Sequence, residues 1–222
     1  MATPPLQIGW YTTERHALQR LPAYQAAGVN LMIAYRSGEP YTSRWLRAAE
    51  AHHVKVLLQP DWRWIAHGNL SALQRFVRRY RGDPALSGWY LYDEPEVNRL
   101  EPRKLAAAYN VIKSIDRHPV AVVFSTGGCR FGAGHIDPAY LKGFDLLMFD
   151  IYPFYARVHV AASRVSQRDF GACVQSARRF HKSGPIIVVQ AFGNGMSDGR
   201  LAWRDPTFAE LQCQVRLARN AG

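Results

Sequence analysis

The chain has 222 residues, of which 48% are hydrophobic, and it carries 28 Lys and Arg against 17 Asp and Glu. This length suits one large domain or two small ones, and the apolar content can fill a core, which excludes a disordered or low-complexity protein. The formal charge of +11 is compatible with nucleic acid, an anionic membrane or an acidic polysaccharide as a partner. However, the arginines are scattered over predicted helices, so a solvated outer face is the preferred interpretation.

Apolar runs of strand length alternate with amphipathic segments along the whole chain. Strands are predicted at 7–13, 29–35, 54–59, 119–125, 145–152 and 185–192, with a further strand in the stretch 86–96 that ends at the acids 93 and 94. Helices are predicted at 14–27, 43–53, 71–80, 102–116, 164–182 and 206–220. This alternation predicts an α/β fold with parallel strands, organised as a single domain over residues 1–222.

The number of strand–helix units favours a barrel. Seven such units are present, whereas a complete TIM-type (β/α)8 barrel of about 250 residues needs eight. We therefore predict a TIM-type barrel that lacks its eighth strand, truncated at the C-terminus relative to a longer barrel. The alternative is a doubly wound nucleotide-binding sheet, but no G-x-G-x-x-G follows the first strand and no G-x-x-x-x-G-K-[ST] occurs. No cofactor is expected.

Cysteine usage and the chain start exclude several other classes. The three cysteines, Cys129, Cys173 and Cys213, form no C-x-x-C pair, so neither a disulfide framework nor a structural zinc site is expected. The chain shows no signal-peptide pattern and no long apolar segment, so we expect no membrane partner. Its localisation stays open between a cytoplasmic protein and a trimmed secreted fragment, and its oligomeric state is not predicted.

The stretch LSGWYLYDEPE, from Leu86 to Glu96, is the most informative part of the sequence. A buried strand ends there in the adjacent acids Asp93 and Glu94, followed by Pro95. Parallel barrels carry their reactive groups at the C-terminal ends of strands, so these acids occupy a catalytic position. The alternative is that both acids cap a helix that begins at Pro95, because Pro and acids suit a first helical turn.

Other strand ends also carry polar or aromatic groups. Those considered for a site are Tyr11, Gln59 with Asp61, Asp150 with Tyr152, and Gln190. Trp62 and Tyr152 offer aromatic faces of the kind that stack on sugar rings. The eight histidines show no metal-binding spacing and no G-x-S-x-G follows a strand, so neither a metal site nor a serine hydrolase is expected.

Three motifs support a resemblance to a known group. GWYLYDEP at 88–95 resembles the fourth-strand motif of clan A glycoside hydrolases, whose barrels carry Asn-Glu-Pro there. FDIYP at 149–153 and VVQAFG at 188–193 resemble the sixth and seventh strand ends of glycosidase-like barrels with a D-E-P fourth strand. The resemblance implies a TIM barrel with Glu94 as general acid/base. The chain departs from the clan at Asp93, which replaces Asn, and at Gln190, which stands near the position of the nucleophilic Glu.

Glycoside cleavage usually needs two carboxyl groups, so a partner for Glu94 must be found. Asp150 is the first candidate for the base or nucleophile, with Asp93 and Asp61 behind it. Their separation would distinguish inversion, at about 6.5–9.5 Å, from retention, at about 5–5.5 Å. Gln190 is expected to hydrogen-bond a sugar hydroxyl or to orient Glu94. The predicted substrate-binding residues are Tyr11, Gln59, Asp61, Trp62, Tyr152 and Gln190.

The sequence thus predicts a glycoside hydrolase that cleaves an oligo- or polysaccharide by carboxylate acid/base catalysis. The alternative is a carbohydrate-binding barrel without hydrolysis. In both cases the partner is a carbohydrate. Nucleic acid is not expected as a partner, because only the net charge favours it.

Overall fold

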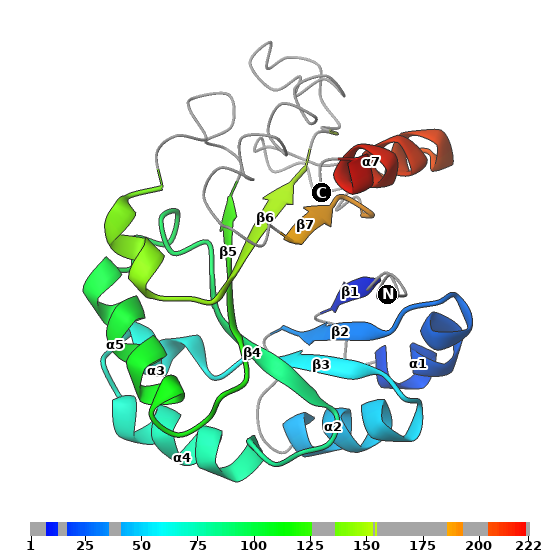
Figure 1. Ribbon diagram of the computed structural model, residues 1–222. Coiled ribbons are helices and arrows are strands. Elements are labelled where there is room, and N and C mark those ends of the chain that lie inside the picture. Colours follow the sequence, from blue (N-terminus) through cyan, green and yellow to red (C-terminus); the bar gives the residue numbers. More distant parts are fainter. Residues whose placement is uncertain are drawn as a thin grey trace, which may run out of the picture. The chain divides into compact units, whose positions relative to one another are not determined.

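A computed structural model describes residues 8–12, 17–35, 41–125, 136–152, 154, 186–192 and 204–220 (Figure 1). These residues group into two compact units. The first consists of Met1–Tyr92, Leu100–Val122 and Ala139–Asp145, and the second of Asp93–Arg99, Val123–Pro138 and Leu146–Gly222. Each unit is described by itself below.

The first unit alternates strands and helices. Its strands are β1 (Gly9–Thr12), β2 (Leu31–Ala34), β3 (Lys55–Leu58), nearly all of β4 (Leu86–Asp93) and the first half of β5 (Val120–Ser125). Its helices are α1 (Ala17–Ala26), α2 (Tyr41–Ala51), α3 (Trp62–Ala66), α4 (Leu70–Tyr80), α5 (Pro102–Lys113) and most of the 3₁₀ helix η2 (Pro138–Lys142). Figure 1 shows helices α1 to α5 along one side of strands β1 to β4.

The second unit contains the end of β5, β6 (Leu146–Ile151), β7 (Ile186–Val189) and α7 (Phe208–Asn220). Strands β6 and β7 pair in parallel, in a register that runs from Met148 opposite Ile186 to Ile151 opposite Val189. The unit also includes residues 93–99, which directly follow β4. The helix predicted at 164–182 lies outside the described residues.

The strand order confirms the predicted fold class. Seven strands of the described residues form one sheet in the order β1-β2-β3-β4-β5-β6-β7. The pairs β1–β2, β2–β3, β3–β4 and β6–β7 are parallel. Parallel strands in chain order, joined by helices, are the wall of a TIM-type (β/α)8 barrel, here with seven of its strands in the described part of the chain.

Strand β4 is buried on both faces, as a strand inside a parallel sheet should be. Trp89, Tyr90 and Leu91 have no exposed surface. The indole Nε1 of Trp89 donates to a carboxyl oxygen of Asp116 at 2.8 Å, which satisfies the one polar atom that the ring brings into the core. A Cβ at Gly88 would lie 2.7 Å from the carbonyl oxygen of Pro119, so no larger residue fits there without movement.

Helix α4 illustrates why the basic residues do not enter the core. Its buried side chains are Ala72, Leu73, Phe76, Val77 and Tyr80, which recur at the spacing of one helix face. Arg75, Arg78 and Arg79 are exposed, in agreement with the predicted solvated face. In the described part of the chain, no helix has the combination of length and apolar character that a membrane crossing demands.

Candidate active site

The segment that follows β4 is a turn and not a helix. Residues 95–99 are turn residues, and the next helix, α5, begins only at Pro102 with Glu101 as its N-cap. Asn98 closes the turn, because its backbone N–H donates to the carbonyl of Glu94 at 2.9 Å and its side-chain amide donates to the carbonyl of Asp93 at 2.7 Å. The alternative that Asp93 and Glu94 cap a helix starting at Pro95 is therefore wrong.

Glu94 has an unusual backbone conformation. Its φ is 44°, in the left-handed region that costs a residue with a side chain about 1–2 kcal/mol. Its N–H donates to the carbonyl of Val123 in β5 at 3.0 Å, and its carbonyl accepts the bond from Asn98. Hydrogen bonds on both sides thus hold a conformation that the chain would otherwise avoid, a pattern found at functional sites.

Asp150 brings a second carboxyl to Glu94. It is the last but one residue of β6, only 6% exposed, and its carboxyl is hydrogen-bonded to the Glu94 carboxyl and to the Tyr152 phenol. Burial, followed by the neighbouring charge of Glu94, holds the pKa of Asp150 well above its usual range, while the bond from Tyr152 acts in the opposite direction. Burial, and then the charge of Asp150, also raises the pKa of the Tyr152 phenol.

The contact between Glu94 and Asp150 gives the site its chemical character. Asp150 keeps its proton more readily than an ordinary Asp, because an ionised carboxyl that is buried beside another negative charge is unfavourable. Asp93 adds a further negative charge, which also raises the pKa of Asp150. The sequence thus identified two acids, Glu94 and Asp150, that interact with each other at the ends of β4 and β6. Whether they support inversion or retention remains a prediction.

Glu96 is a third acidic residue of this turn, and it was not among the site residues predicted from the sequence. One of its carboxyl oxygens, Oε1, accepts a hydrogen bond from the Ser125 N–H at 2.6 Å. Burial, opposed in part by backbone N–H groups and reinforced by the charges of Glu94 and Asp93, raises the pKa of Glu96 to about 7. Its position two residues after Glu94 in the DEPE motif was the only available signal.

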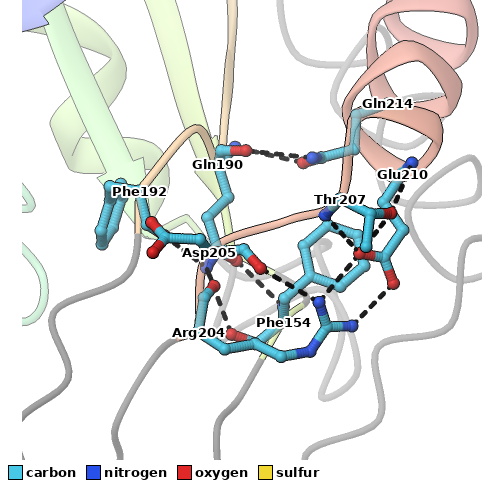
Figure 2. A network of polar contacts seen from close by, with 8 residues as sticks. All are labelled: Phe154, Gln190, Phe192, Arg204, Asp205, Thr207, Glu210 and Gln214. Atoms are coloured by element: carbon cyan, nitrogen blue, oxygen red, sulfur yellow. Dashed lines mark hydrogen bonds and ion pairs between the residues drawn. The ribbon is translucent and has the colours of Figure 1, made fainter.

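Gln190 lies in a different network, shown in Figure 2. Its side-chain Oε1 accepts from the Phe154 N–H at 2.9 Å, and its Nε2 donates to the carbonyls of Phe154, Phe192 and Arg204 at 3.0–3.2 Å. The Gln214 side chain pairs with the backbone N–H and carbonyl of Gln190, both at 3.1 Å. With three acceptors around two amide hydrogens, the geometry favours a structural role for Gln190 over the predicted sugar-binding or orienting role.

An aromatic pair borders the carboxyl site. The rings of Tyr152 and Phe192 meet edge to face, with centroids 5.0 Å apart. Phe192 is 38% exposed. Aromatic faces of this kind suit the apolar face of a sugar ring. No group of three or more His, Cys, Asp or Glu side chains within the described ranges is arranged to hold a metal ion.

The other predicted residues lie in the first unit. The Tyr11 hydroxyl donates to the Tyr90 hydroxyl, and the Tyr11 ring also packs against Tyr35 with a centroid distance of 5.4 Å. Gln59 directly follows β3 and is 2% exposed. These two residues therefore sit at the ends of β1 and β3, as predicted, and their role in substrate binding remains a prediction.

Asp61 and Trp62 begin helix α3. Asp61 is the N-cap and accepts from the Arg63 N–H at 3.0 Å, and its carboxylate pairs with the Arg63 guanidinium at 2.6 Å. These hydrogen bonds with Arg63 lower the pKa of Asp61. The Asp61 carboxylate therefore caps helix α3 and pairs with Arg63. Trp62 is 44% exposed and remains a candidate for stacking on a sugar.

Parallel strands in chain order, with acidic residues at the ends of β4 and β6, define a TIM-type barrel protein with a carboxyl-based candidate site. No protein-family model matches the chain, and no curated protein matches it either. Its likeness to solved structures is therefore a likeness of fold.

Several similar solved structures are glycoside hydrolases. One is a provisionally assigned α-L-fucosidase from Bacteroides thetaiotaomicron, with a TM-score of 0.70 and 12% identity over 97% of this chain and 82% of that one. A family 1 β-glucosidase from Thermotoga maritima has a TM-score of 0.61 and 9% identity over 93% and 73%. A family 39 glycoside hydrolase from Bacteroides cellulosilyticus has a TM-score of 0.55 and 14% identity over 83% and 48%, so this chain spans about half of its length. The chain thus has a glycoside hydrolase-like fold.

Proposed function

We propose that this protein hydrolyses glycosidic bonds of an oligo- or polysaccharide, with the Glu94–Asp150 pair as its reactive centre. The observation that supports this most is the interaction of the buried Asp150 carboxyl at the end of β6 with the Glu94 carboxyl that follows β4, which raises the pKa of Asp150. The glycoside hydrolase-like fold and the strained backbone of Glu94 support it further.

The difference in solvent exposure between Glu94 and Asp150 suggests which of the two donates the proton. Glu94 is partly exposed, whereas Asp150 is buried, so Glu94 is the better placed to deliver the shared proton to the glycosidic oxygen. The carbon–oxygen bond then breaks, and positive charge that develops on the sugar ring is stabilised by the two negative charges left on the pair. Water adds to the anomeric carbon and returns a proton to the pair. The raised pKa of Asp150 keeps that proton bound at a higher pH than an ordinary Asp would.

The test is the release of new reducing ends from a panel of polysaccharides and aryl glycosides. Wild-type protein is expected to cleave at least one substrate, and Glu94→Gln and Asp150→Asn are each expected to lower kcat about 100-fold or more, the usual contribution of a general acid or base. Glu50→Gln and Asp205→Asn are matched controls at exposed positions and should leave the rate unchanged. Wild-type turnover by Glu94→Gln would show that Glu94 is not the acid.

A specific observation favours a second function, carbohydrate binding without hydrolysis. Gln190 stands near the position of the nucleophilic Glu in clan A barrels, but it is an amide, which cannot act as a nucleophilic carboxylate, and its side chain is bonded to backbone groups. A binding protein should be retained by a polysaccharide in a gel-shift assay while no reducing ends appear. Glu94→Gln should then leave the retention unchanged, which separates this function from the first.

A further inference from the structure

The turn that carries Glu94 is attached to β5 at two points. The first is the backbone bond from the Glu94 N–H to the Val123 carbonyl, at 3.0 Å. The second is the bond from the Ser125 N–H to the Glu96 carboxyl, at 2.6 Å. The second depends on a side chain, so Glu96 is a residue through which the sequence can specify this attachment.

The Glu96 carboxyl lies in a setting that a surface acid would not occupy. Its Oε2 is buried and has no hydrogen-bond partner among the described residues. The negative charges of Asp93 and Glu94, on the same turn, raise the pKa of the Glu96 carboxyl. From β5, the Ser125 N–H donates a hydrogen bond to this carboxyl. An ionised carboxyl is unfavourable at this position, because one of its oxygens is buried without a hydrogen-bond partner among the described residues and two negative charges lie on the same turn.

Glu94 needs support from this attachment. Its left-handed φ of 44° would relax toward an ordinary conformation if the turn were free, and the carboxyl would then leave Asp150. Asn98 closes the turn internally by binding the carbonyls of Asp93 and Glu94. These bonds close the turn onto the end of β4, but they do not join it to β5.

We propose that Glu96 is a positioning residue that fixes the 93–99 turn to the end of β5 and so keeps the Glu94 carboxyl against Asp150. The catalytic consequence of this inference rests on the proposed hydrolase function, but the geometric claim does not. Because Glu96 acts through Glu94, its loss should affect the chemical step and not the affinity for substrate.

Three variants separate the possibilities. Glu96→Ala removes the acceptor for Ser125, Glu96→Gln retains an acceptor oxygen of the same reach, and Val97→Ala changes an exposed neighbour in the same turn. For Glu96→Ala we expect kcat to fall at least 10-fold with KM within twofold, and hydrogen exchange of the Ser125 amide to accelerate. Glu96→Gln should stay within about threefold of wild type, and Val97→Ala should match wild type in both measurements.

A crystal structure of Glu96→Ala decides the geometric claim without any substrate. We expect Glu94 to have left the left-handed region and its carboxyl to have separated from Asp150. If Glu94 keeps its φ and its contact with Asp150, or if kcat of Glu96→Ala equals that of wild type, the proposal is wrong. Absence of hydrolysis by wild-type protein would contradict the proposed function alone, and the crystal structure would then still decide whether Glu96 positions Glu94.

Discussion

At the residue level, Glu94 combines two features that oppose folding. Its backbone is left-handed, and its carboxyl lies against the buried Asp150. Neither feature would persist at a position chosen for stability alone, and residues that carry such costs often do so for function.

The cost of the Glu94 backbone can be measured with two substitutions. Glu94→Gly and Glu94→Ala both remove the carboxyl, but only glycine adopts a positive φ without strain. We expect the free energy of unfolding to be about 1 kcal/mol higher for Glu94→Gly than for Glu94→Ala in urea denaturation. At Val97, whose φ is not positive, the order should reverse, with Val97→Gly less stable than Val97→Ala. Equal stability of the two Glu94 variants would contradict the strained conformation.

Gln190 provides a second test at this scale, because the resemblance to clan A barrels places it near a nucleophilic Glu. If that resemblance extended to function, Gln190→Glu would improve hydrolysis. The structure predicts the opposite, since a carboxylate would face the carbonyls of Phe154, Phe192 and Arg204 in place of an amide donor. We expect Gln190→Glu to lower the free energy of unfolding by at least about 2 kcal/mol.

The matched control for that substitution is Gln212→Glu, on an exposed position of α7, which should change stability little. Circular dichroism during thermal denaturation, together with the reducing-end assay, checks both variants. A stable Gln190→Glu protein with increased hydrolysis would restore the nucleophile hypothesis.

Sequence reasoning identifies some of these residues and not others, for physical reasons. Asp93, Glu94 and Asp150 stand out because acids at the end of a buried apolar strand are unusual. Their mutual contact is not visible, because the sheet brings together strands that are distant in sequence. The role of Gln190 is equally hidden, since its partners are mostly backbone groups, which carry no sequence signal.

At the level of elements, the 93–99 turn is the part of the structure most sensitive to pH. In the folded protein the pKa of Glu96 is raised to about 7, from an ordinary value near 4.5, mainly by burial. A raised folded-state pKa means that the folded protein keeps a proton that the unfolded chain has already lost. Stability from this group is therefore fully present below about pH 4.5 and is lost as the pH rises through about 7.

This linkage is testable by urea denaturation between pH 4.5 and 8. The contribution of Glu96 should make the wild-type free energy of unfolding fall over this range more steeply than that of Glu96→Gln, which cannot titrate. Asp93, Glu94, Asp150 and Tyr152 remain in both proteins, so the difference between the two curves isolates Glu96. Parallel curves for wild type and Glu96→Gln would contradict the raised pKa.

The strands and the longer helices of the described residues agree with the sequence, whereas two five-residue helices do not. Strand β4 and helix α4 are close to their predicted ranges, because an extended apolar run and a helical spacing of apolar residues are strong signals. Helix α3 and the 3₁₀ helix η2 were not predicted, since five residues are too few to show a period. Strand β4 ends at Asp93, at the adjacent acids where the sequence places its end, and Glu94 follows in a left-handed conformation.

At the level of the whole molecule, the strand order was predictable because alternating strands and helices leave few arrangements open. The order β1 to β7 and the likeness to glycoside hydrolases at 9–14% identity both follow from that alternation. A fold of this kind supports many reactions, so the function must be argued from the carboxyl pair and not from the barrel.

The measurement that tests the central claim most directly is a pH titration of the Asp and Glu side-chain carboxyls, observed by carbon-13 NMR on labelled protein. We expect the carboxyl signal of Asp150 to titrate at a pH well above the ordinary range for Asp, because its pKa is raised. This signal should vanish in Asp150→Asn and shift to lower pH in Glu94→Gln, because the neighbouring negative charge is gone. If Asp150 titrates in the ordinary range for Asp, and Glu94→Gln does not alter it, the two carboxyls share no proton and the proposed centre is wrong.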